Sequence, residues 1–341
     1  MRFAFESYKL ETRLAIAKRK SNMNKGLHRY TVFVTCATLF LIVAGALVTS
    51  HDAGLATNDW PLSNGQVFPE MEGNLFWEHG HRMVATSVGL LIIGLNIWLW
   101  KREERAWVRR LGLVALCAVI IQGLLGGLTV KLMLPLAVSA AHATLAQLVL
   151  CMMVSLSVFT APGWREPRPG LKEKEGSPLP LLCLGTALAI LVQLVIGATL
   201  RHSATWDQYL PTGLLLTHMG GALLVTLVLG GTLWTVFKRY RGETYLTKPA
   251  LLAGGVLGLQ LLLGVAAFLA RRASPSAPQP RNPMVGITVA HVACGALVFA
   301  LTIVLTLRAF RLLAEMRWPA RTLRRGGADA PATGHKAMAD L

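Results

Sequence analysis

Eight charge-poor apolar runs dominate the 341-residue chain and restrict what it can fold into. A helix that crosses a bilayer needs about 20 consecutive, mostly apolar residues. Runs of this length cover residues 30–50, 82–100, 111–130, 134–160, 179–200, 211–237, 249–270 and 284–307. The sequence therefore predicts an all-α integral membrane protein with eight transmembrane helices.

The positions of the basic residues predict how these helices are oriented. The formal net charge of +17 would point to nucleic acid in a soluble protein. Here, all but six of the 34 Lys and Arg residues lie on one side of the predicted membrane; the six exceptions are Arg82, Lys131, Arg201, Arg271, Arg272 and Arg281. The positive-inside rule assigns the basic side, with both termini, to the cytoplasm. We therefore expect a lipid bilayer as partner and no nucleic acid.

The runs group into two halves of four helices, flanked by polar segments. Residues 1–29 contain acids and no apolar core, so we expect a cytoplasmic basic arm there in place of a cleavable signal peptide. The further divisions are an N-terminal half (30–160) with a long outer loop (51–77), a cytoplasmic linker (161–178), a C-terminal half (179–307) and a cytoplasmic tail (308–341), disordered from about residue 318.

An internal repeat appears when the odd-numbered spans are aligned. In the third, fifth and seventh spans Gln is followed four residues later by Gly, at Gln122 and Gly126, Gln193 and Gly197, and Gln260 and Gly264. Each even-numbered span opens with a histidine and has a small residue one turn later: His81 with Ala85, His142 with Ala146, His218 with Ala222, and His291 with Gly295. His79 is followed by Met83 in that place, so the repeat selects His81.

This pattern favours cofactor binding over simple hydrogen bonding. A lone histidine in a membrane span is more often an interhelical hydrogen-bond partner. A ring of porphyrin size, however, needs a flat wall beside its axial histidine, and Ala or Gly one turn away provides it. Two facing imidazoles can hold one haem iron. The repeat thus predicts two pseudo-repeated four-helix bundles, with His81 paired to His142 and His218 paired to His291.

The two halves differ in one carboxylate. Glu78 precedes His81 by three residues, so both side chains lie on nearly the same helix face. The equivalent positions in the C-terminal half are Leu215 and Thr288. A polar cluster that only caps a helix at the membrane surface is the alternative reading of Glu78 and its neighbours. The asymmetry predicts that the C-terminal half holds a haem and that the N-terminal half acts on one.

These residues carry a resemblance to a known family. The E-H-G-H-R at 78–82, the D-W-P-L at 59–62, the A-H-A-T-L at 141–145, and His218 and His291 in register resemble the haem A synthase family of cytochrome oxidase assembly proteins. The resemblance covers about residues 30–308 and implies eight helices in two halves. Some members carry a cysteine pair in the first outer loop, one of them directly after D-W-P-L. Here Ser63 takes that place and the loop has no cysteine, so a redox role for loop thiols is excluded.

The resemblance also implies roles for individual residues. His218 and His291 would ligate a haem b, while His81 and His142 would flank the iron of the substrate, haem O. Glu78 would be the catalytic carboxylate. Arg82 would either hold a haem propionate or pair with Glu78; an arginine that only anchors the helix at the interface is the alternative.

The leading hypothesis is an oxidoreductase that converts haem O to haem A for terminal oxidase assembly, oxidising the C8 methyl to a formyl group by successive hydroxylation. Two alternatives remain: a di-haem b electron-transfer protein of the membrane, and a non-enzymatic haem carrier or assembly chaperone. Further expected partners are an unidentified electron donor, haem O synthase and oxidase subunits. The short N-terminal segment favours the bacterial inner membrane.

Overall fold

The computed structural model describes residues 2–164, 177–206, 211–272 and 283–317. Most of the expected linker and the tail expected to be disordered lie outside this part of the chain. The helices are α1 (Arg2–Ser50), α2 (Gly73–Arg102), α3 (Ala106–Lys131), α4 (Leu136–Thr160), the short η1 (Pro162–Trp164), α5 (Leu179–Trp206), α6 (Thr212–Arg239), α7 (Thr244–Arg272) and α8 (Met284–Arg317). Each of the eight α-helices contains a candidate membrane span. The predicted all-α fold with eight membrane-spanning helices is confirmed.

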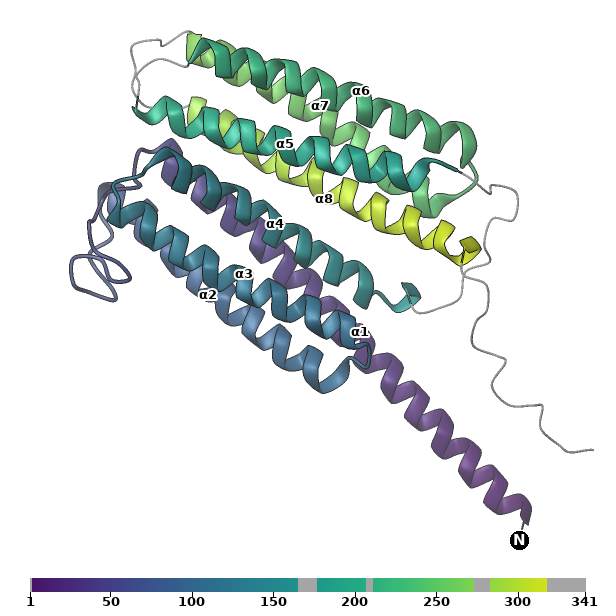
Figure 1. Ribbon diagram of the computed structural model, residues 1–341. Helices are drawn as coiled ribbons and strands as arrows, with labels where there is room; N and C mark the ends of the chain where they lie inside the picture. Colours follow the sequence, from purple (N-terminus) through teal and green to yellow (C-terminus); the bar gives the residue numbers. More distant parts are fainter. Residues whose placement is uncertain (1, 165–176, 207–210, 273–282, 318–341) are drawn as a thin grey trace, which may run out of the picture.

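The helices form two groups of four that lie side by side (Figure 1). In the first group, contacts run in a ring from α1 to α2, α3, α4 and back to α1, and in the second from α5 to α6, α7, α8 and back to α5. The groups meet through α1, α4, α5 and α8, and α4 and α8 are the most deeply buried spans. The other four helices lie on the outer flanks, where apolar side chains face lipid.

Two helices begin well before their apolar runs. The residues expected as an arm are helical from Arg2 and continue into the first span, so that α1 extends beyond the bundle (Figure 1). The second helix begins at Gly73, whose φ of +54° is readily adopted only by glycine. Residues Glu78 to Arg82 therefore lie within α2 and not at its N-terminal end. Apolar runs mark the part of a helix that lipid surrounds, whereas polar turns extend the helix on either side.

One apolar cluster of each half lies away from the long loop. In the first half it includes Leu95, Leu99 and Leu156, near the end of the bundle from which α1 projects. In the second half the cluster at the same end includes Leu179 and Leu246. We call this the arm end, and the end that carries residues 51–72 the loop end. A further cluster reaches toward the repeat histidines, since Ala146 and Val292 pack against it; van der Waals packing, which holds helices together in a membrane, thus extends along the bundle.

The loop between α1 and α2 has a defined structure. Ser63 and Gln66 exchange two backbone hydrogen bonds of 3.1 and 3.0 Å, and Asn64 and Gly65 between them have φ values of +53° and +71°. Positive φ at both central residues is typical of a type I′ turn. The Asp59 carboxylate accepts hydrogen bonds from the N–H groups of Gly65 and Asn64 at 2.7 and 3.0 Å. These bonds, chiefly the one from Gly65, hold the pKa of Asp59 well below its usual value.

The loop also docks onto α3, and this contact is testable. A β-carbon added at Gly127 would lie 2.6–2.9 Å from three atoms of the Trp60 indole, whereas one added at Gly123 would meet nothing within 4 Å. Gly127→Val should therefore displace Trp60 and raise deuterium uptake of residues 55–66 several-fold in hydrogen-exchange mass spectrometry. The matched variant Gly123→Val should exchange like wild type. Equal uptake in both variants would contradict the docking.

Candidate functional site

Each of the four repeat histidines lies against a glycine of the preceding helix. A β-carbon added at the glycine would lie only 3.0–3.2 Å from Cε1 of the imidazole; the pairs are Gly45 with His81, Gly126 with His142, Gly197 with His218, and Gly264 with His291. Optimal contacts between carbon atoms are about 3.5–4.0 Å. Glycine therefore allows the ring to approach the helix backbone more closely than any other residue would. As the repeat predicted, His81 and not His79 makes this contact.

The repeat glutamines fix the same helix pairs. The Nε2 groups of Gln122 and Gln193 donate to the carbonyl oxygens of His142 and His218 at 2.9 and 2.8 Å. On α7 the contact involves the ring, because His291 Nδ1 lies 3.2 Å from the carbonyl oxygen of Gln260. These hydrogen bonds tie α4, α6 and α8 each to the preceding helix in an apolar medium, where polar groups find few other partners.

His218 and His291 face each other across the second half. Their ring centroids are 6.4 Å apart and their planes are inclined by 70°. Two imidazoles that bind one metal ion, each through a nitrogen about 2 Å away, have centroids roughly 6 Å apart. Haem iron accepts such a pair of axial ligands. The centroid separation of this pair is therefore close to the one that a shared iron would require, although both ring nitrogens of His291 lie within 3.3 Å of Gln260 in this structure.

The pair in the first half has unused nitrogens. His81 on α2 and His142 on α4 contact Gly45 of α1 and Gly126 of α3. Nδ1 of each ring is buried without a hydrogen-bond partner in the described part of the chain. A buried polar atom left unpaired costs about 1–3 kcal/mol, so such an atom often marks the place of a water, an ion or a ligand. Two such imidazoles also form a donor set that suits a haem.

Glu78 is buried, with 4% of its surface exposed, between α2 and the loop. Its Oε2 accepts a hydrogen bond of 3.1 Å from the backbone N–H of Thr57, and its Oε1 pairs with the Arg82 guanidinium. Arg82 Nη1 also donates to the carbonyl oxygens of Asp59 and Leu62 at 3.0 and 2.6 Å. Of the roles considered for Arg82, the structure shows the pairing with Glu78. A buried carboxylate is tolerated when paired and hydrogen-bonded in this way.

His79 has a different environment from His81. Its Nδ1 lies 2.8 Å from the Ser63 hydroxyl, which also accepts a hydrogen bond of 3.1 Å from Arg82 Nη1. The ring is 4% exposed. His79 thus faces the loop and His81 faces the bundle, since residues two apart lie on different sides of a helix. Two residues of the E-H-G-H-R motif, His79 and Arg82, therefore bind the D-W-P-L-S segment.

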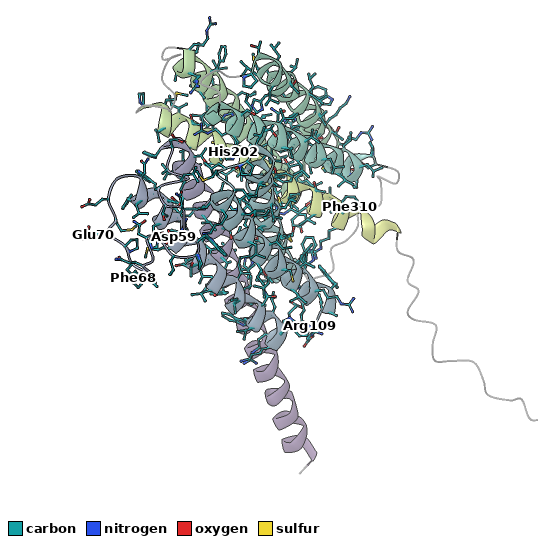
Figure 2. The ribbon with its side chains drawn as sticks, turned by 60° about the vertical axis from the view of Figure 1, so that its left-hand side comes forward. Asp59, Phe68, Glu70, Arg109, His202 and Phe310 are labelled. Carbon is teal, nitrogen blue, oxygen red and sulfur yellow. The ribbon has the colours of Figure 1, made fainter. Side chains whose placement is uncertain are left out.

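One further histidine lies at this end of the molecule. Figure 2 shows His202, near the end of α5, toward the same end as Asp59, whereas Arg109 lies at the arm end. The helix of His202 packs against α4, which carries His142.

The fold and the site define a class: a multi-pass membrane protein with four half-buried histidines at equivalent positions near one end of its two four-helix halves. The family model described as "Cytochrome oxidase assembly protein" matches residues 70–303, which include Glu78 and all four repeat histidines. The chain belongs to this family, and the resemblance predicted from its motifs is confirmed.

Relatives with the name heme A synthase match the chain. The protein of Shouchella clausii is 30% identical over 277 residues, covering 74% of this chain and 90% of the relative. That of Alkalihalophilus pseudofirmus is 27% identical over 270 residues, with the same coverage of 74% and 90%. That of Bacillus licheniformis is 29% identical over 192 residues, covering 54% of this chain and 61% of the relative.

Sequence reasoning missed some residues of the site. Gly45 follows Leu41 by four residues, so α1 carries the repeat glycine without the repeat glutamine on which the alignment was based. Because the glutamine is absent, the repeat gave no signal for Gly45. The contacts of Thr57 and Ser63 with α2 join residues 16 to 21 positions apart through an irregular loop. No periodic pattern in the sequence predicts such contacts.

The glycine contacts lead to a test with a matched control. Gly264→Ala places a methyl carbon 3.0 Å from Cε1 of His291 and must move the ring, whereas Gly258 on the same helix has nothing within 4 Å of an added carbon. Gly264→Ala should lower the haem-to-protein ratio of the purified protein several-fold or shift its Soret band. Gly258→Ala should leave both unchanged. Wild-type haem content with an unaltered spectrum in Gly264→Ala would contradict a role of the glycine in placing the ring.

Proposed function

We propose that this chain is a haem A synthase. It is an oxidoreductase that oxidises the C8 methyl group of haem O to a formyl group and so provides haem A for terminal oxidases. Membership of the cytochrome oxidase assembly family and the relatives named heme A synthase support this proposal. The observation that carries it is the presence of a histidine pair in each half, with a buried carboxylate beside only one of them.

The C-terminal half is the proposed haem b site. His218 and His291 would hold the iron, and Gly197 and Gly264 set the position of their rings. An iron held by two imidazoles supplies one-electron transfer. The protein contributes the orientation of the imidazoles, because Gln193 fixes the backbone of α6 at His218.

The N-terminal half is the proposed substrate site. His81 and His142 would flank the iron of haem O, for which their unpaired Nδ1 atoms and their contacts with Gly45 and Gly126 are suitable. Each hydroxylation of the methyl group removes two electrons from the carbon, so it needs an external oxidant: either dioxygen, with two further electrons from a donor, or water as the oxygen source together with an electron acceptor. Two such steps would give a geminal diol, which loses water to leave the formyl group. The electron donor acts from outside the chain.

Glu78 is the proposed catalytic carboxylate. Hydroxylation and loss of water both require protons to move at oxygen, which a positioned carboxyl group accelerates. Glu78 shares a helix face with His81, and the loop that covers it reduces its contact with water. Arg82 is a positioning residue, because it holds the Glu78 carboxylate and the loop carbonyls together.

Pigment analysis separates the proposal from its alternatives. A di-haem b electron-transfer protein would account for the histidines but would leave Glu78 and its loop contacts without a role. A haem carrier or assembly chaperone would bind haem O unchanged. The protein should be expressed with a haem O synthase in a host that makes no haem A. Haem A in the extracted pigment supports the enzyme, haem O alone supports the carrier, and two equivalents of haem b support the electron-transfer protein.

The chain is a multi-pass membrane protein, and we propose that it resides in the bacterial inner membrane with both termini in the cytoplasm. The basic residues concentrated on one side support this orientation. The loop end and Glu78 would then lie on the outer side. Haem O synthase, oxidase subunits and an electron donor are the proposed partners.

The orientation predicts which sites are reachable in intact cells. Tags at the two termini should be protected from external reagents. A cysteine introduced at the exposed Asn64 should react with a membrane-impermeant maleimide in a variant that lacks the natural cysteines. Labelling of Asn64→Cys only after the cells are opened would overturn the orientation.

The role of Glu78 predicts a specific defect. Glu78→Gln keeps the size of the side chain but cannot exchange a proton, so haem A formation should fall about a hundredfold or more. The variant should retain haem b and accumulate haem O or a partly oxidised haem, measured by chromatography of extracted pigments. Glu78→Asp should form haem A at a rate between those of the wild type and Glu78→Gln.

The control for this test is Glu70→Gln, which alters an exposed carboxylate at the edge of the same loop (Figure 2). It should make haem A at the wild-type rate. Wild-type haem A production by Glu78→Gln would reduce Glu78 to a structural partner of Arg82.

A further inference from the structure

A chain of polar contacts connects Glu78 to His79, a histidine that the repeat does not use. The Glu78 carboxylate pairs with the Arg82 guanidinium, whose Nη1 donates a hydrogen bond of 3.1 Å to the Ser63 hydroxyl. That hydroxyl lies 2.8 Å from Nδ1 of His79. Ser63 is fully buried and His79 is 4% exposed, so the contact between them is shielded from water. The loop thus links the proposed catalytic carboxylate to a buried imidazole.

The direction of each hydrogen bond follows from the groups themselves. A guanidinium only donates, so the Ser63 oxygen accepts from Arg82. The hydroxyl has one proton, and among the described residues the partner that can accept it is Nδ1 of His79. His79 therefore accepts at Nδ1. Loss of this acceptor would leave a buried hydroxyl proton without a partner, which costs more than an average hydrogen bond contributes.

Ser63 is held by two residues of one helix face. His79 and Arg82 are three residues apart in α2, so their side chains reach the same part of the loop. Asp59, in the same segment as Ser63, lies next to the bundle, whereas Phe68, which is 77% exposed, projects away from it (Figure 2). The contacts of Ser63 therefore fix the part of the loop that lies against α2.

The orientation of Arg82 depends on this segment. Its Nη2 pairs with Glu78. Its Nη1 donates to three loop oxygens at 3.0, 2.6 and 3.1 Å, those of Asp59, Leu62 and Ser63. Because a guanidinium is planar and rigid, the contacts of Nη1 set the direction of Nη2. A shift of the segment would turn the group that holds the carboxylate.

We infer that His79 is a positioning residue for the Glu78 carboxylate. Its Nδ1 holds the Ser63 hydroxyl, and with it residues 59–63, on α2. The oxygens of that segment orient Arg82, which in turn directs the carboxylate. The inference rests on the proposed function, which gives Glu78 its part in proton movement. It adds to the first half a residue that lies outside the histidine repeat.

Two substitutions of His79 separate the Nδ1 contact from the bulk of the ring. The amide of asparagine reaches as far from the backbone as Nδ1 of histidine, and that of glutamine as far as Nε2. With haem O added to membranes, His79→Gln should lower kcat for haem A formation, per bound haem b, about tenfold and leave KM within about twofold, because a misplaced carboxylate weakens the transition state more than binding. His79→Asn keeps a partner for Ser63 and should retain about half of the wild-type kcat or more.

Variants of serine test whether His79 acts through Ser63. Ser63→Ala should lower kcat at least as much as His79→Gln, and the double variant should lose no more than Ser63→Ala alone, since changes within one contact are not additive. The matched control is Ser87→Ala, because Ser87 is exposed on the same helix and its hydroxyl donates to Met83 within that helix. It should retain the wild-type kcat.

Three results would overturn the inference: wild-type kcat in His79→Gln, equal losses in His79→Asn and His79→Gln, or losses that multiply in the double variant. If His79→Gln does not accumulate, Ser63→Ala takes its place, and a wild-type kcat in that variant overturns the inference.

Failure of the inference is distinguishable from failure of the proposed function. If the wild-type protein forms no haem A from haem O, the proposed function is wrong. If the wild-type protein forms haem A and Glu78→Gln lowers its formation while His79→Gln does not, only the positioning role of His79 is wrong.

Discussion

The close approach of imidazole rings to glycine backbones sets the dimensions of both halves. In a membrane there is little hydrophobic gain in bringing two helices together, so packing and interhelical polar contacts decide where they meet. At Gly45, Gly126, Gly197 and Gly264 the absent side chain leaves room for a ring, and the ring fills it. All four histidines are consequently held near the loop end. Large apolar residues such as Leu95 and Leu246 pack at the arm end, and the four histidines gather near the loop end.

The two halves differ in the polar groups near equivalent histidines. On the helix of His81, the buried Glu78 and the half-buried Arg82 are satisfied by the loop backbone, so the loop is part of the candidate site. At His218 and His291, the polar partners are Gln193 and Gln260 on the preceding helices. A duplicated scaffold can in this way surround equivalent histidines with different polar groups without any change in the fold.

Apolar run length was sufficient to predict the eight spans, because the bilayer dictates that length. Helix ends such as Arg2 and Gly73 could not be predicted, since polar turns extend helices beyond the apolar runs. The four histidines were found through their periodic spacing, a signal that survives in one sequence. The contacts of Glu78 with Thr57 and of His79 with Ser63 depend on how an irregular loop folds back. The choice between the roles of Arg82 likewise required the tertiary structure.

The loop also bears on how the protein matures. All five cysteines lie within helices, and the position after D-W-P-L is Ser63, where the resemblance to related sequences would allow a cysteine. The loop is instead closed by the Asp59 carboxylate on the Asn64–Gly65 turn and by Arg82. Hydrogen bonds of this kind form without a catalyst once the loop meets α2. Closure of this loop therefore involves no thiol oxidation, because the segment has no thiol to oxidise.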